Sequence, residues 1–176
     1  MNNKNTLKKI IEDQYSMKKD WSTSLINIIK SWDEKLTHDL IKGWINIDLK
    51  DNNWTTPLMR AVMSWKIDIA NDLIKNWANI NLINKSWMTA LMFAITHYKI
   101  HKDKSLIEIL IDIQNINYQD KQWNTALMIA VHWWYADVVK LLIEYGADVN
   151  IKNVVEETAF MKAQKMGYKD IEKILS

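Results

Sequence analysis

A seven-residue motif recurs along this chain at a nearly constant spacing, and it constrains the fold more than any other feature. Its pattern is Thr, Pro or Ala, Leu, Met, any residue, Ala, then Val or Ile, at 56–62, 89–95 and 125–131. The anchoring threonines lie 33 and then 36 residues apart, and degenerate copies at 23–25 and 158–163 lie 33 residues to either side. Such a period predicts stacked copies of one small unit, each burying its apolar face against its neighbours.

The motif and its period resemble the ankyrin repeat, and the resemblance covers most of the chain. At 141–150 the run Leu-Leu-Ile-Glu-Tyr-Gly-Ala-Asp-Val-Asn looks like the outer helix and exit of that repeat almost letter for letter. The resemblance implies an all-α fold, an ankyrin-repeat solenoid of stacked helix–turn–helix units with finger turns like β-hairpins. A single domain over 1–176 is expected, with a cap at each end. Its expected parts are a capping helix at 1–19, repeats at about 20–50, 51–83, 84–119 and 120–152, and a C-terminal cap at 153–176.

Local signals predict where the helices begin. Thr56 can cap a helix with its hydroxyl, and Pro57 suits the first helical position because its ring presets φ. Thr23 is expected to cap the first helix in the same way. In the third repeat, about four extra residues near 97–104 are expected to bulge outward from the turn between the helices, because each repeat contacts only its neighbours.

Composition and charge narrow the possible functions. The net charge is only +2 and Arg60 is the single arginine, so nucleic-acid binding, which usually relies on arginine, is not expected. The chain has no cysteine, which removes disulfides, thiolate catalysis and thiolate metal sites. No signal peptide, lipidation motif or apolar run of membrane-spanning length is present. We therefore expect a soluble cytoplasmic monomer without a membrane partner; delivery into a host cell is the alternative.

Motifs for catalysis or cofactor binding are missing, including a phosphate loop, a nucleophile elbow and a dinucleotide fingerprint. His97 and His101 are four residues apart and could share a helix face, with Asp103 nearby. A zinc site needs at least a third ligand and the flanking lysines repel a cation, so solvated histidines are the favoured interpretation. We expect no enzyme activity, no cofactor and no metal.

One motif position is always methionine. In ankyrin repeats this position is usually a histidine that hydrogen-bonds within the turn, whereas methionine can only pack. Core packing is therefore favoured over an adaptable ligand groove. The residues are Met59, Met92, Met128 and Met161.

The resemblance also implies a function, because ankyrin arrays act mostly by binding other proteins. Their usual surface is concave and combines the finger tips with the exposed face of each inner helix. We therefore expect a non-catalytic protein–protein interaction module. A regulatory or targeting subunit of an enzyme system, or a fragment of a larger ankyrin-containing protein, is the alternative. The corresponding partner-binding residues are Asn52, Asn53, Thr55, Met63, Ser64, Lys85, Ser86, Met88, Thr96, His97, Lys121, Gln122, Asn124 and His132.

Tryptophan is abnormally frequent and glycine abnormally rare, with ten Trp against three Gly. Nine of the ten lie at repeat positions where the resemblance implies glycine. They stand two residues before the anchoring threonine, in the turn between the helices, where the last repeat has Gly167, or at the exit of the outer helix, where the fourth repeat has Gly146. The three groups are Trp21, Trp54, Trp87 and Trp123; Trp32, Trp65 and Trp134; and Trp44 and Trp77, with Trp133 off the pattern.

Glycine serves at positions that need a positive φ or a close backbone approach. A left-handed conformation costs a residue with a Cβ about 1–2 kcal/mol, so nine such sites would cost on the order of 9–18 kcal/mol, comparable to the whole stability of a domain. UGA is one base from the glycine codon GGA, and variant codes read it as Trp or as Gly. The many Asn, Lys and Ile residues fit an AT-rich gene, so we predict UGA codons that the source organism reads as glycine. A genuine aromatic ridge for a ligand is the alternative.

Overall fold

The computed structural model describes residues 21–31, 34–42, 46–112 and 114–176. The chain divides into two compact units, Met1–Asn79 and Ile80–Ser176, and each is described by itself. The capping helix predicted at 1–19 lies outside the described residues.

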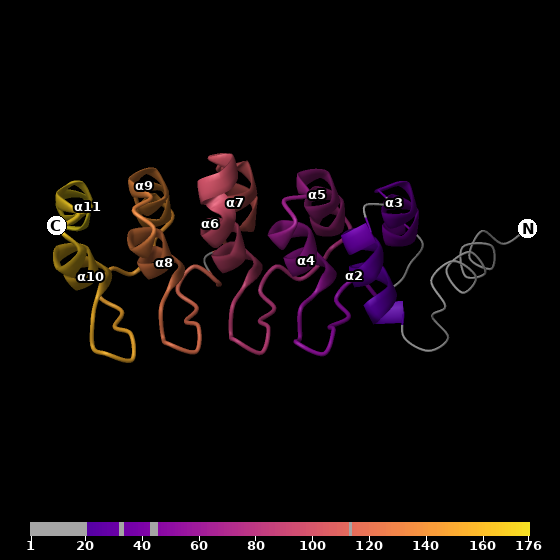
Figure 1. Ribbon diagram of the computed structural model, residues 1–176, viewed down its shortest axis with the longest axis horizontal. Coiled ribbons are helices and arrows are strands. Elements are labelled where there is room, and N and C mark those ends of the chain that lie inside the picture. The colour runs from indigo at the N-terminus through magenta and orange to yellow at the C-terminus, as the bar shows by residue number, and fades with distance from the viewer. Residues whose placement is uncertain (1–20, 32–33, 43–45, 113) are drawn as a thin grey trace, which may run out of the picture. The chain divides into compact units, whose positions relative to one another are not determined.

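The first unit contains two helix–turn–helix pairs. Helix α2 (Trp21–Ser31) packs against α3 (Glu34–Lys42), and α4 (Pro57–Met63) packs against α5 (Ile67–Lys75). The pairs stack on each other through α2 with α4 and through α3 with α5 (Figure 1). Apolar residues at helical spacing form the core of this stack. Those no more than 1% exposed include Leu25, Ile28, Ile29, Leu58, Ala61, Val62, Ile69, Ala70 and Leu73.

The second unit contains three further pairs. They are α6 (Ala90–His101) with α7 (Ser105–Leu110), α8 (Ala126–His132) with α9 (Ala136–Glu144), and α10 (Ala159–Met166) with α11 (Lys169–Leu175). Helix α8 packs between α6 and α10, and α9 packs against α11 (Figure 1). In the described part of the chain the regular elements are all helices. The predicted all-α fold of repeated helix–turn–helix units is therefore confirmed.

Threonine caps the inner helix of four repeats, as predicted at Thr56. In each, the hydroxyl oxygen accepts a hydrogen bond from a methionine amide three residues later, at 3.2 or 3.3 Å. The cap satisfies a backbone N–H group that has no partner within the helix, and so defines where the helix begins. The four caps are Thr56, Thr89, Thr125 and Thr158.

The first repeat begins differently, and the predicted cap at Thr23 is wrong. In the described residues α2 covers Trp21–Ser31, so both Trp21 and Thr23 are helical residues. The four later repeats have Asp or Asn five residues before the threonine, and this side chain accepts backbone N–H groups in the preceding turn. The corresponding residue of the first repeat is Lys18, whose ammonium can only donate. The first repeat therefore lacks the acceptor that precedes the other caps.

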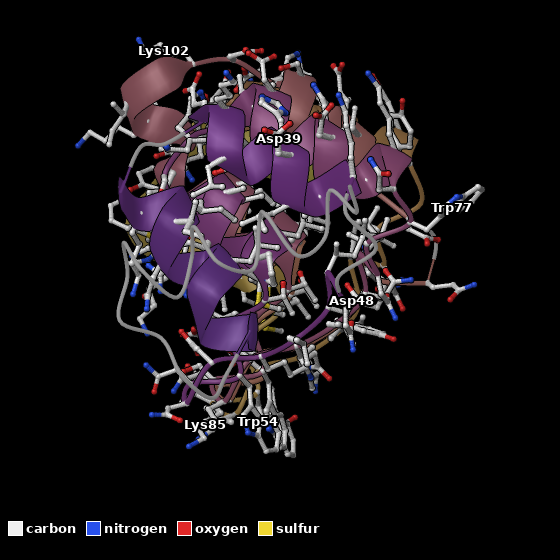
Figure 2. All side chains as sticks on the ribbon, turned by 90° about the vertical axis from the view of Figure 1, so that its right-hand side faces the viewer. Asp39, Asp48, Trp54, Trp77, Lys85 and Lys102 are labelled. Carbon is white, nitrogen blue, oxygen red and sulfur yellow. The ribbon has the colours of Figure 1, made fainter. Side chains whose placement is uncertain are left out.

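The extra residues of the third repeat lengthen a helix, so the predicted outward bulge is wrong. Helix α6 has 12 residues, whereas α4 and α8 have 7 each. Tyr98 lies in the added turn, packs edge-on against Tyr135 with ring centroids 5.0 Å apart, and donates a hydrogen bond to Asp137. Burial raises the pKa of Tyr98 far above its usual value, and the hydrogen bond to Asp137 is the second-largest cause. These contacts stabilise the added turn, which ends at Lys102 (Figure 2).

Candidate functional site

A finger turn precedes each capped helix, and the same hydrogen bonds fold all four turns. The first residue is Asp or Asn, and its side-chain oxygen accepts the N–H groups of the third and fifth residues at 2.8–3.1 Å. The fourth residue has a φ of 60–62°. A side-chain acceptor of this kind takes the place of a backbone carbonyl and specifies the turn locally. The fingers are 51–55, 84–88, 120–124 and 153–157, with Trp54, Trp87, Trp123 and Glu156 as their fourth residues.

In the second unit the fingers are joined to one another. The amide of Lys121 donates to the carbonyl of Ser86 at 3.2 Å, and the amide of Val154 donates to the carbonyl of Gln122 at 3.1 Å. The three fingers therefore form a row with a spacing set by main-chain hydrogen bonds. Figure 1 shows this row on one side of α6, α8 and α10.

A cavity of about 280 Å³ lies in the second unit, where the fingers meet the inner helices. Two fingers supply three of its lining residues, and α6, α8 and α10 supply most of the others. The lining consists of Met88, Asp120 and Asn124 from the fingers, Thr96 from α6, Met128, Ile129 and His132 from α8, Trp133 just after α8, and Lys162 from α10.

Several polar groups of this cavity already serve the fold. Asp120 Oδ1 accepts the N–H groups of Gln122 and Asn124, both at 2.9 Å. The hydroxyl of Thr96 donates to the carbonyl of Met92 at 2.8 Å. These groups already have hydrogen-bond partners within the fold. They are therefore poorly placed to act as a general base or a nucleophile.

Apart from the Asn124 amide, which contacts Asp120 and Asn153, the other lining groups are apolar or basic. Met128 is buried and Ile129 half-buried, and both present hydrocarbon or thioether surface. His132 is exposed, and its ring packs edge-on against Trp133 with centroids 5.2 Å apart. Lys162 is half-buried and contributes the one lysine of the cavity lining. Among the described residues, no three His, Cys, Asp or Glu side chains come together as a metal site would require.

The structure brings several predicted contact residues together. Four of them line the cavity: Met88, Thr96, Asn124 and His132. Four more are exposed on the finger tips of the same unit: Lys85, Ser86, Lys121 and Gln122. These eight residues belong to one continuous run of fingers and inner helices.

The other predicted residues are less uniform. In the first unit Asn52 and Asn53 are exposed on a finger, and Met63 and Ser64 are half-buried at the end of α4. Thr55 is only 5% exposed, and its amide and carbonyl both bond to Asp51, so it supports the turn and offers little surface. His97 is half-buried and shares a 2.9 Å hydrogen bond with the carbonyl of Phe93.

Five cavity residues are absent from the predicted contact set: Asp120, Met128, Ile129, Trp133 and Lys162. Ile129 and Lys162 occupy the variable fifth position of the seven-residue motif, which is Arg60 in the second repeat and Phe93 in the third. Variation at one position within an otherwise constant helix is the signal that could have identified them. Three of the four motif methionines are buried, as predicted, whereas Met161 is 47% exposed.

An ion pair joins the last finger to α10. Lys165 Nζ lies 2.7 Å from Glu157 Oε1, and this hydrogen bond lowers the pKa of Glu157 below its usual value. The charge of Lys162, which lines the cavity, also lowers the pKa of Glu157.

Comparison with known families agrees with the repeated architecture. The family model described as ankyrin repeats (3 copies) matches residues 58–153 and 101–176, which together span more than half of the chain. A search of curated proteins finds no match. In the described residues, no helix is both long and apolar enough to cross a bilayer. Four threonine caps, four equivalent fingers and the family match lead to one conclusion: the chain belongs to the ankyrin-repeat family.

Proposed function

We propose that this chain is a non-catalytic protein-binding module, whose second unit holds a segment of a partner protein between the finger tips and the inner helices. Ankyrin repeats are in general protein–protein interaction modules. The observation that carries the proposal is the cavity, because it joins predicted contact residues from two fingers to side chains of α6, α8 and α10.

The size of the cavity favours a macromolecular partner. Its volume of about 280 Å³ is at the lower limit of the roughly 300–1,000 Å³ of small-molecule pockets. It suits one or two side chains of a larger ligand. A stable protein interface needs about 800 Å² from each partner, so the exposed finger tips beside the cavity have to contribute as well.

The charges on this face indicate the chemistry of the segment. Lys85 and Lys121 are exposed on neighbouring fingers, and Lys162 lines the cavity. The carboxylates of the same face have partners: Asp120 accepts backbone amides, Glu156 pairs with Lys152, and Glu157 pairs with Lys165. A partner segment that carries carboxylates next to an apolar anchor is the complementary choice, because charge complementarity aids specificity and association rate.

Site-specific photo-crosslinking tests the proposal. A photoreactive amino acid at exposed Gln122 or His132 reports on the binding face, and the same group at exposed Lys140 or Glu144 of α9 is the matched control. We expect protein adducts from the two binding-face positions in an extract of the source organism. We expect few from α9.

Lys162→Glu adds a directional test, since it reverses a charge in the cavity wall. The binding-face adducts should decrease with this variant and should persist with Lys140→Glu. Equal labelling from both faces, or loss with both variants, would contradict the proposed face. Adducts to nucleic acid alone would contradict the proposed class of partner.

A further inference from the structure

Tryptophan dominates the strained backbone positions of this chain. Among the described residues, eight non-glycine residues have a positive φ, and six of these are Trp. Trp133, the tryptophan that does not follow the repeat pattern, has an ordinary φ of −91°. The six left-handed residues are Trp54 (61°), Trp65 (53°), Trp77 (70°), Trp87 (62°), Trp123 (60°) and Trp134 (59°).

The exit of the outer helix allows a direct comparison within the protein. The amide of Trp77 donates to the carbonyl of Ile74, three residues earlier, at 3.0 Å. The amide of Gly146 makes the same bond to Ile143 at 2.9 Å after helix α9. Both residues follow the helix cap and both have a positive φ, 70° and 90°. One backbone conformation thus carries Trp in one repeat and Gly in another.

The turn between the paired helices gives the same result. The amides of Trp65, Trp134 and Gly167 each donate to the carbonyl three residues earlier, at 3.0–3.1 Å. The three φ values are 53°, 59° and 73°. Gly167 is therefore the internal reference for two of the tryptophans. Glycine is the residue that adopts this region without a steric penalty.

The six tryptophans occupy three different kinds of turn. Trp54, Trp87 and Trp123 lie on finger tips, Trp65 and Trp134 lie between helices, and Trp77 lies at a helix exit. A ligand ridge along the fingers would explain at most three of them, whereas the left-handed backbone conformation is common to all six.

At three of these positions the ring gains little from its surroundings. Trp77 is 90% exposed and extends into solvent (Figure 2). Trp134 donates to Asp170 at 3.1 Å and stacks on Tyr168, and Lys50 lies 5.5 Å from the ring centroid of Trp54. These are contacts at exposed sites, where stacking and cation–π interactions stabilise only weakly.

We propose that the natural protein carries glycine at these six positions, and that its gene encodes them as UGA codons read as glycine in the source organism. A residue with a Cβ in this region lowers the folded-to-unfolded ratio roughly 5- to 30-fold. If the six separated sites act independently, even the lower factor multiplies to roughly ten-thousand-fold. Substitution of GGA by UGA through one base, followed by reassignment, explains why a single residue type recurs at these sites.

The glycine proposal changes the expected binding surface and so deepens the proposed function. The glycine residues can nevertheless be tested without any measurement of partner binding. With glycine at 87 and 123, the finger row of the second unit presents main chain at those points, beside Ser86 and Gln122. A partner could then approach the backbone closely. Its contacts would come from polar finger residues and from the cavity, and an aromatic surface would make no contribution.

The gene sequence and the native protein provide the test. We expect UGA at all six codons. In protein isolated from the source organism, we expect the proteolytic peptides that contain these positions to have the mass of glycine. The peptides that contain Gly146 and Gly167 are matched controls, because both interpretations give them glycine. The same spectra report on Trp21, Trp32, Trp44 and Trp133.

A mass corresponding to Trp at most of the six positions would overturn the proposal, and so would UGG codons. A stability measurement adds independent evidence. The chain with glycine at all six positions should unfold at a higher urea concentration than the chain as written. A lower midpoint would show that the indoles stabilise the fold, and would count against the proposal. None of these results depends on partner binding, so failure of the proposed function remains distinguishable.

Discussion

Replacement of Trp77 by glycine should stabilise the protein. Trp77 follows the C-terminus of α5 with a φ of 70°, and its amide and that of Ala78 close the helix end by bonding to Ile74 and Leu73. Both hydrogen bonds come from the backbone and are kept in the glycine variant. The substitution removes a Cβ from the left-handed region and an indole from the surface, and it changes no other group.

The magnitude follows from three terms. Relief of the left-handed conformation contributes about 1–2 kcal/mol. The greater freedom of glycine in the unfolded chain offsets about 0.4–1 kcal/mol of this. Removal of the indole costs little, because Trp77 is 90% exposed. We therefore expect a net gain of about 1 kcal/mol, which corresponds to a rise in Tm of about 2–4 °C for a chain of this length.

Urea unfolding followed by circular dichroism measures this difference, and two variants serve as controls. Trp77→Ala removes the indole but keeps a Cβ, so its free energy of unfolding should stay within about 0.5 kcal/mol of the parent. Gly146→Ala places a Cβ at the equivalent exit, where no atom lies within 4 Å to clash with it. Its cost, about 1 kcal/mol, should therefore be conformational. The reasoning fails if Trp77→Ala stabilises as much as Trp77→Gly, because the gain would then come from loss of the ring.

Three further predictions concern the caps and the charged contacts. Thr89→Val should lower the free energy of unfolding by about 1 kcal/mol through loss of the N-cap. Thr89→Ser keeps a hydroxyl and should retain most of the stabilisation that the cap provides. Since the pKa of Glu157 is lowered in the folded state, its ionised form stabilises the fold above the unfolded pKa, and this contribution is lost as pH falls through the folded value. Glu157→Gln should therefore destabilise at pH 7 and have little effect near pH 2, as measured by urea unfolding at both values. Tyr98→Phe should lower the free energy of unfolding by about 1 kcal/mol if its hydrogen bond to Asp137 supports the added turn of α6. An unchanged urea midpoint would contradict that role.

Much of the fold could be predicted because its determinants are local. A threonine hydroxyl that caps a helix and a proline at the first helical position act within a few residues, so Thr56 and Pro57 predicted the start of α4 correctly. The acceptor at the start of each finger is just as local. The same local rule explains the error at Thr23, because Lys18 stands where the later repeats have Asp or Asn.

The features that could not be predicted depend on contacts between distant residues. The added turn of α6 rests on Tyr98, whose partners Tyr135 and Asp137 lie in the next repeat. In the cavity, Met88 and Lys162 come from different repeats, and only the stacking of α6, α8 and α10 brings them to one place. Sequence spacing identified the face to which they belong but could not specify which side chains border a common space.

A positive φ at a residue with a side chain is not in itself a sign of recoding, and this chain contains two useful counterexamples. Lys102 ends the lengthened α6 with a φ of 50°, and Glu156 occupies the fourth position of the last finger with a φ of 61°. Glu156 has the conformation of Trp54 and Trp87, so that site tolerates a Cβ when the rest of the fold compensates. A domain stabilised by about 5–15 kcal/mol can carry two such residues at about 1–2 kcal/mol each. It cannot readily carry six more of a single type, spread over three kinds of turn. The number of these tryptophans and their uniform conformation, more than the strain at any one of them, support glycine as the natural residue.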